Sequence, residues 1–219
     1  MTSFSTDADL LKWEPLLMRD LAPEGQRLAR GGGASTQACQ VTAPDAAFSS
    51  ARVRPGHIIH LAAADGSVDG YWEVRSVDDE THLTATVVGC ETDAWVPLPT
   101  ATELDYSIHT FDPQHEEARW ALLARFGLEA DAAAPDEDLA RWISDHRSLR
   151  RASVALVLAT LYRGQSADGP EASGLARKAD HYARLYEDEI TKTRLHLDRD
   201  ADGLTDDVRS LSSHRLRRD

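Results

Sequence analysis

Four aspartates near the C-terminal end of the chain have the spacing of a calcium-binding loop. Asp198, Asp200 and Asp202 alternate with other residues, Gly203 follows, and Asp206 lies three positions beyond the glycine. Oxygen ligands at every second position can converge on one hard cation when the backbone wraps around it, and the glycine permits a sharp turn. These four aspartates are therefore the candidate metal ligands of the chain.

The loop is incomplete when it is compared with an EF-hand. Its twelfth position is Arg209, where an EF-hand has a glutamate that binds calcium through both oxygens. No second copy of the motif occurs in the sequence. The alternative interpretation is an acidic turn that binds no metal. We expect no cofactor, and calcium is the alternative.

No catalytic signature accompanies this motif. The sequence has no Gly-x-Ser-x-Gly, no phosphate loop ending in Gly-Lys-Ser or Gly-Lys-Thr, and no His-Glu-x-x-His. His115 and Glu116 begin the last of these patterns, but position 119 is arginine. Cys39 and Cys90 are isolated, without the Cys-x-x-Cys spacing of a metal site. The sequence predicts a protein that is not an enzyme.

The C-terminal residues 208–219 form a basic segment on an acidic chain. The formal net charge of the chain is −13, and the segment contains four arginines and a single acid. It has too few apolar residues to order itself, so we expect an extended tail. Because guanidinium groups pair with carboxylates through two parallel hydrogen bonds, the arginines are candidate partner-binding residues. They are Arg209, Arg215, Arg217 and Arg218.

Composition limits the class of protein. The chain has 219 residues, of which 42% are hydrophobic and 28% charged. These values are typical of a soluble globular protein with one large domain or two small ones. The acidic charge argues against ordinary binding of duplex DNA, which requires clustered lysines and arginines. No apolar run is long enough to span a bilayer and no signal peptide is evident, so we expect no membrane partner.

Helical periodicity predicts two groups of helices. Residues 6–13 and 15–21 form a short pair, and a helix opens at Asp112-Pro113 and ends at Gly127. Residues 152–162 are apolar on nearly every side, which is typical of the enclosed central helix of a core. An amphipathic helix follows, with its stripe at Leu175, Ala179, Tyr182, Tyr186, Ile190, Thr193 and Leu197.

Strand periodicity is confined to the middle of the chain. Alternating residues and turn signals predict strands at 38–42, 57–63, 71–77, 82–88 and 104–110. The glycine run Gly31-Gly-Gly33 is interpreted as a flexible linker before them.

The expected fold is therefore α+β: a mainly helical body with an inserted small antiparallel β barrel or sandwich. Residues 1–30 would supply the N-terminal helices of the body, 38–110 the inserted β-domain, 111–207 the rest of the helical body, and 208–219 the extended basic tail.

The helical segments resemble the head–tail connector, or adaptor, proteins of long-tailed bacteriophages and gene transfer agents. The resemblance is carried by the run from Leu149 to Tyr162, by His181-Tyr-Ala-Arg-Leu-Tyr186 and by Leu197-Asp-Arg-Asp-Ala-Asp-Gly203. The front segment from Asp7 to Pro15 is also similar to the N-terminal helix of that family. The strand-rich residues 38–110 depart from the family's minimal all-helical pattern.

The resemblance implies a structural protein of the virion neck. Such a protein forms a ring of about twelve copies below the portal, since head-to-tail contacts close into a ring when the rotation fits. The ring would enclose the channel that DNA passes through without specific binding, and an acidic wall would repel the phosphates. The C-terminal tail would reach the portal, and the opposite surface would receive the next neck or tail protein. Assembly would take place in the host cytoplasm.

Two alternatives remain open at the level of sequence. Within virion proteins, the chain would be a head-closure or tail-completion component. In another functional class, it would be a calcium-binding interaction module.

Overall fold

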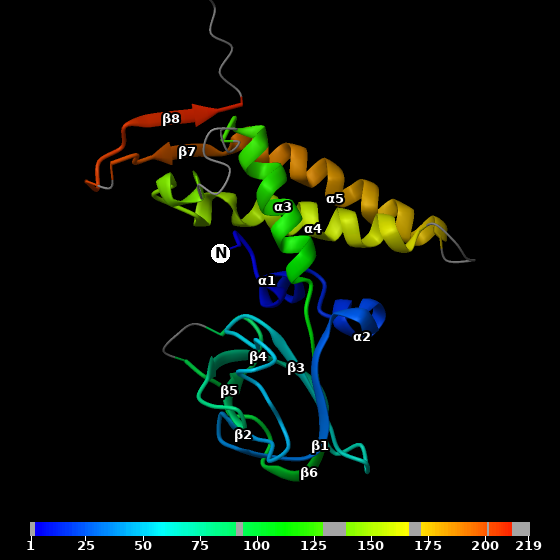
Figure 1. Ribbon diagram of the computed structural model, residues 1–219. Helices are drawn as coiled ribbons and strands as arrows, with labels where there is room; N and C mark the ends of the chain where they lie inside the picture. Colours follow the sequence, from blue (N-terminus) through cyan, green and yellow to red (C-terminus); the bar gives the residue numbers. More distant parts are fainter. Residues whose placement is uncertain (1–2, 91–93, 129–138, 167–171, 201, 212–219) are drawn as a thin grey trace, which may run out of the picture. The chain divides into compact units, whose positions relative to one another are not determined.

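The computed structural model describes residues 3–90, 94–128, 139–166, 172–200 and 202–211 (Figure 1). These residues form five α-helices, two short 3-10 helices and eight strands. The helices are α1 (Asp7–Trp13), α2 (Leu17–Leu21), η1 (Glu24–Gln26), α3 (Asp112–Arg125), η2 (Leu139–Trp142), α4 (Arg147–Gln165) and α5 (Ala172–Lys192). The strands are β1 (Arg27–Gln37), β2 (Gln40–Thr42), β3 (Ile58–Ala62), β4 (Asp69–Val77), β5 (His82–Thr86), β6 (Ala101–His109), β7 (Arg194–Leu197) and β8 (Asp207–Ser210).

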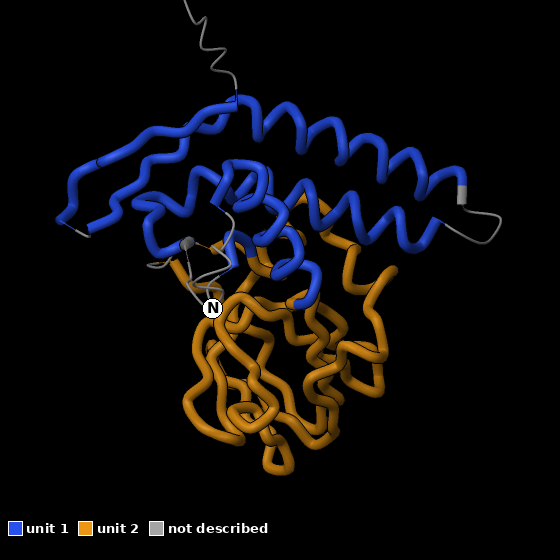
Figure 2. Tube along the Cα trace, turned by 45° about the horizontal axis from the view of Figure 1, so that its top comes forward, with its two compact units in different colours: residues 1–5, 113–219 blue, residues 6–112 orange. Residues whose placement is uncertain are grey.

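The chain divides into two compact units, coloured separately in Figure 2. The barrel unit comprises Thr6–Asp112, and the helical unit comprises Met1–Ser5 together with Pro113–Asp219. Helices α1 and α2 fall in the barrel unit, although the sequence suggested that residues 1–30 belong to the helical body. Each unit has its own hydrophobic core.

The barrel unit is a closed antiparallel barrel with the strand order β1-β2-β5-β4-β3-β6. Strands β1 and β6 pair with each other and close it. Residues from every strand alternate inward into one core, as the two-residue period of a strand requires. The core includes Val41, Ile59, Val74, Leu83 and Ile108, each fully buried.

The glycine run that the sequence suggested as a linker lies inside β1, so that interpretation is wrong. Gly31 is paired with Tyr106 of β6. A Cβ added at Gly31 would lie 2.7 Å from the ring of Tyr106, closer than packed atoms allow. The absent side chain therefore makes room for an aromatic ring, which packs edge to face on Phe48 in the barrel core. Irregular register on either side of the run lets β1 bend along the barrel.

Helix α1 starts with a capping box at Thr6. The Thr6 hydroxyl accepts a hydrogen bond from the Asp9 backbone N–H, and the Asp9 carboxylate accepts one from the Thr6 backbone N–H. Asp7, also buried, accepts a hydrogen bond from the Phe111 backbone N–H at 2.9 Å. Residues at the two ends of the barrel unit are thereby tied together.

Helix α4 is the enclosed helix of the helical unit, as predicted. Most of its side chains between 152 and 159 are buried, and Leu158 is fully buried. Helix α5 packs along it, with Ala179, Tyr182 and Ile190 buried on the predicted stripe. The rings of Tyr162 and Tyr182 stack with centroids 5.9 Å apart.

The predicted apolar stripe extends beyond the end of helix α5. Helix α5 ends at Lys192, and Leu195 and Leu197 lie in strand β7. Both leucines are fully buried, and they alternate with exposed neighbours. Leu197 fits the next helical turn as well as a two-residue strand period, so the spacing alone did not separate the two structures. Strand β7 pairs with β8, and Leu197 also forms a bridge with Ile143.

The expected mainly helical body is wrong. Helices make up 38% of the structure and strands 27%, and the largest sheet is a closed six-stranded barrel. The expectation undercounted strand because β1, β7 and β8 were assigned to a linker, a helix end and a tail. No described helix is long and apolar enough to cross a membrane.

Candidate functional site

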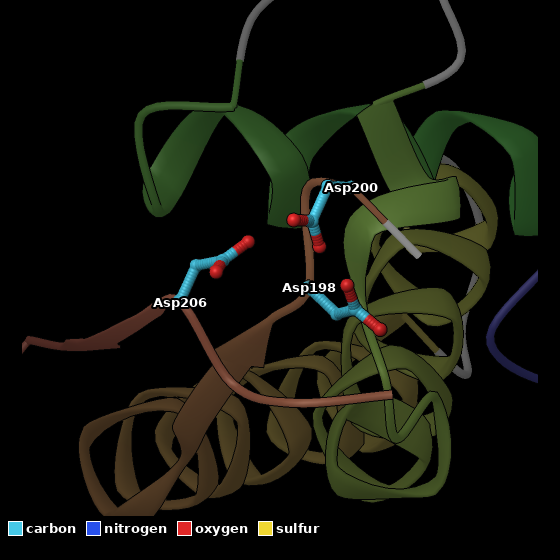
Figure 3. A group of neighbouring side chains, drawn as sticks. All are labelled: Asp198, Asp200 and Asp206. Carbon is cyan, nitrogen blue, oxygen red and sulfur yellow. The ribbon is translucent and has the colours of Figure 1, made fainter. Parts of the chain in front are cut away.

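The acidic turn between β7 and β8 brings three of the four predicted metal ligands together. Oxygen atoms of Asp198, Asp200 and Asp206 all lie within 4.8 Å of one another. Figure 3 shows these three side chains on the connection between the strands. Asp202 lies apart from the group, and its carboxylate accepts a hydrogen bond from the Leu204 backbone N–H at 2.7 Å.

Backbone amides of the turn already bind all three of these carboxylates. The Asp202 N–H donates to Asp200 Oδ1 at 3.4 Å. The Gly203 N–H donates to Asp198 Oδ2 at 2.9 Å, and the Arg199 N–H donates to Asp206 Oδ2 at 2.7 Å. Gly203 has φ +86, in the left-handed region that glycine adopts without strain. The aspartates therefore shape the turn through local hydrogen bonds, as Asp residues do in many loops.

The turn is fixed to the rest of the helical unit through Trp142. The Asp198 N–H donates to the Trp142 carbonyl at 2.7 Å, and the guanidinium of Arg199 lies 5.6 Å from the centre of the Trp142 ring. Asp198 Oδ1 is buried and has no hydrogen-bond partner among the described residues. That oxygen is available to a further ligand or to a water molecule.

The geometry differs from an EF-hand in its flanking elements. Strands, not helices, precede and follow the turn. Calcium takes six to eight oxygen ligands, whereas three carboxylates converge here. The turn can bind a hard cation weakly through these carboxylates. Without a cation, it is an acidic hairpin held by its own hydrogen bonds.

Arg209 lies in β8, so the expected start of the extended tail at residue 208 falls inside a strand. Its guanidinium donates to the carbonyls of Phe126 and Gly127, at 2.6 and 2.9 Å, and pairs with Asp207 at 3.3 Å. These carbonyls lie at the C-terminal end of α3, where helix carbonyls lack partners within the helix. Arg209 therefore caps a helix of its own chain. Much of its hydrogen-bonding capacity is used within the chain and is not free for a partner. Arg215, Arg217 and Arg218 lie outside the described residues.

A buried polar cluster in the helical unit was missed by the sequence analysis. The Ser5 hydroxyl lies 2.8 Å from Nδ1 of His115 and 2.7 Å from the Ser153 hydroxyl. All three residues are at most 2% exposed. A serine beside a histidine is the start of a nucleophilic site, but a substrate cannot reach this pair. The cluster instead joins three distant segments of the chain, and no local spacing could have revealed it.

A second missed cluster lies at the end of the barrel unit. Asp112 accepts from Nε2 of His57 at 3.1 Å and pairs with Arg54 at 2.7 Å. Burial by itself raises the pKa of Asp112, but the hydrogen bonds and positive charge of His57 and Arg54 outweigh it and hold that pKa well below the ordinary range. The carboxylate is thus ionised throughout the neutral and mildly acidic range.

Comparisons with known proteins add no identification. No protein-family model matches the sequence, and neither the curated proteins nor the solved structures searched contain a significant match. The function is therefore argued from the residues and their arrangement.

Proposed function

We propose that the chain is a structural neck protein of a virion, a head–tail adaptor that forms a ring below the portal and joins it to the tail. One observation supports this most directly. Three of the segments that carry the resemblance to adaptor proteins form one assembly of α4, α5 and the β7–β8 hairpin, in which Leu149, Ala152, Ile190 and Leu197 share a core. The remaining segment, Asp7 to Pro15, belongs to the barrel unit. Residues of those three segments, chosen by similarity, thus also belong together physically.

The charge of the chain suits this role. With a net charge of −13, a ring of copies would surround the DNA with acidic side chains. Phosphates are repelled by such a wall, so DNA would pass through without adhering. The role is structural and not enzymatic, and the proposed neighbours are further copies of the chain, the portal, and the next neck or tail protein.

In this proposal, portal attachment falls to the arginines of the C-terminal tail. Arg209 caps α3 within its own chain, so the attachment is assigned to Arg215, Arg217 and Arg218. The segment removed in a test must accordingly begin after Leu211, because deletion from residue 208 would also remove β8.

The test compares how well three proteins attach to portal rings from the same virus: the wild-type chain, a truncated chain and a control variant. Deletion of 212–219 should abolish attachment and leave the melting temperature unchanged. Replacement of Arg177, Arg184 and Arg194 by alanine is the matched control, since it removes the same number of arginines from exposed sites of the helical unit. Cosedimentation of the truncated protein with portal rings would overturn the tail assignment and move the contact to a folded unit.

The closed barrel favours a second candidate among virion proteins, a head-closure or tail-completion component. It forms an independently packed unit that the minimal helical adaptor pattern lacks. Attachment of the chain to tails and not to portal rings would favour this candidate.

A calcium-binding interaction module is the candidate from another class. The convergence of Asp198, Asp200 and Asp206, with a buried oxygen that has no partner among the described residues, favours it. The missing glutamate and the small number of converging carboxylates count against it. A calcium titration, described below, decides between them.

A further inference from the structure

A polar cavity lies on the outer face of the barrel, apart from the acidic turn. Its volume is about 410 Å³, within the range of small-molecule sites. Its walls come from η1, β1, β3 and β6, all in the barrel unit. The polar side chains that matter for its chemistry are Arg27, Arg30, His60, Asp105, Ser107 and His109.

Strand register explains why these side chains face outward together. Ser107 of β6 is paired with Arg30 of β1 on one side and with His60 of β3 on the other. His60 is in turn paired with Tyr71 of β4, and their rings stack with centroids 4.6 Å apart. Directly opposed residues on neighbouring strands share one face, so a polar row crosses four strands while their neighbours fill the core.

Half of the acidic, basic and histidine side chains that line the cavity are already paired. Arg27 forms an ion pair with Glu24, and His60 pairs with Asp69 at 2.7 Å. These pairs leave the cavity a smaller set of groups with which to bind a ligand.

Three donors remain. Among the described residues, Arg30 and the Ser107 hydroxyl form no hydrogen bond or ion pair, and Nε2 of His109 is buried without a hydrogen-bond partner. Buried polar atoms in folded proteins are nearly always hydrogen-bonded, so Nε2 of His109 is available to a water molecule or to a ligand in the cavity.

The electrostatic surroundings of His109 point to the charge of that group. Burial lowers the pKa of His109, and the positive charges of Arg27, His60 and Arg30 lower it further, while Glu24 alone raises it. The two arginines and His60 thus act together on this ring against Glu24. An anion in the cavity would relieve that repulsion.

We propose that the cavity binds an oxyanion, the phosphate or carboxylate group of a small ligand. The guanidinium of Arg30 pairs with two of its oxygens, as arginine does with planar carboxylates and with phosphates. Ser107 and His109 donate to the remaining oxygen atoms. Asp105, an exposed acid at the same cavity, limits the affinity by repulsion. This binding role is independent of the proposed role in a virion neck.

The test is calorimetric titration of the full chain with inorganic phosphate and, separately, with acetate, in a buffer whose only other anion is chloride. Arg30→Gln should weaken binding by about tenfold or more, because a hydrogen bond to a charged group contributes roughly 1.5–3 kcal/mol. Asp105→Asn should strengthen binding, because it removes a repelling charge. Arg52→Gln is the control, since it removes an exposed arginine of the same unit that does not line the cavity.

Each outcome has a definite meaning. Binding of phosphate but not acetate identifies a phosphate-bearing ligand, and binding of both identifies a carboxylate-bearing one as well. Opposite effects of Arg30→Gln and Asp105→Asn support the site even if one variant is poorly folded, because the other still reports on it. Absence of binding for both anions, or equal binding in all variants, would overturn the proposal.

A second readout locates the anion. The imidazole resonances of His109 should titrate at higher pH when phosphate is bound, since the anion stabilises the protonated ring. The groups that act on this ring are Glu24, Arg27, Arg30 and His60. An unchanged His109 titration under saturating phosphate would place the anion elsewhere on the chain.

Discussion

At the scale of single residues, the functions of glycine and arginine depended on distant partners. Gly31 was interpreted as a linker residue because two glycines follow it. The structure instead requires a glycine there because the ring of Tyr106, far along the chain, occupies the space of a side chain. Arg209 reads as part of a basic tail, but the carbonyls at the end of α3 bind it. Local sequence carries no signal for either contact.

Replacement of Gly31 by alanine should destabilise the barrel by about 1–3 kcal/mol, the cost of forcing extra atoms into a packed core. The added Cβ would contact the ring of Tyr106 at 2.7 Å. Gly25→Ala is the control, because nothing lies within 4 Å of its added Cβ. Denaturant titration of the two variants measures the difference, and equal midpoints would show that the ring moves without cost.

Asp112 should make the stability of the barrel unit depend on pH. The pKa of Asp112 is lowered in the folded state, whereas an aspartate in an unfolded chain has a pKa of about 4. As the pH falls through that value, the unfolded chain takes up a proton before the folded chain does, so stability is lost below about pH 4 and is fully present above it.

Asp112→Asn should therefore be less stable than the wild type at pH 7 and should show a weaker loss of stability between pH 5 and the acid limit of the measurement. Asp45→Asn provides the control, because exposed Asp45 forms no hydrogen bond or ion pair with the described residues. Denaturant midpoints across this range give the comparison. Parallel curves for Asp112→Asn and the wild type would show that the Asp112 carboxylate does not cause the pH dependence of stability.

The acidic turn should show no saturable calcium heat at millimolar concentrations. Backbone amides already occupy Asp198 Oδ2 and Asp206 Oδ2, and Asp202 lies outside the group. Calorimetry of the full chain, with Asp200→Asn as the comparison, tests this expectation. A calcium heat that Asp200→Asn abolishes would instead establish the calcium-binding module.

At the scale of elements, the sequence predicted the helices better than the strands. The apolar run of α4 and the stripe of α5 as far as Ile190 each follow a local period, and both are confirmed. Five strands of the barrel, β2 to β6, were also anticipated. Strands β1, β7 and β8 were not anticipated. The glycines of β1 and the short length of β7 and β8 hide the alternation that predicts a strand, and the charge of the last segment favoured a tail. The convergence of three aspartates followed from their spacing, whereas the exclusion of Asp202 did not.

Arg209→Ala should destabilise the helical unit by about 1–3 kcal/mol, because two carbonyls at the end of α3 would lose a charged donor. Arg194→Ala on β7 is the matched control, since its exposed side chain forms no hydrogen bond or ion pair with the described residues. Thermal unfolding of the two variants should separate them clearly. Identical melting curves would mean that water replaces the cap at no cost.

At the scale of the whole molecule, the chain combines two units with separate cores and an overall acidic charge. Such an organisation suits a protein that meets more than one neighbour, because each unit offers its own surface. The proposed virion role further requires that copies of the chain recognise one another, which no property of a single copy determines. For this reason the assembly, and not the fold, carries the central claim.

Cryo-electron microscopy of the purified chain mixed with the portal protein of the same virus tests that claim most directly. We expect a closed ring of about twelve copies below the portal and around its channel, with the C-terminal arginines in contact with portal carboxylates. Bare portal rings beside free monomers of the chain, at concentrations well above those of assembly reactions, would contradict the proposed neck function.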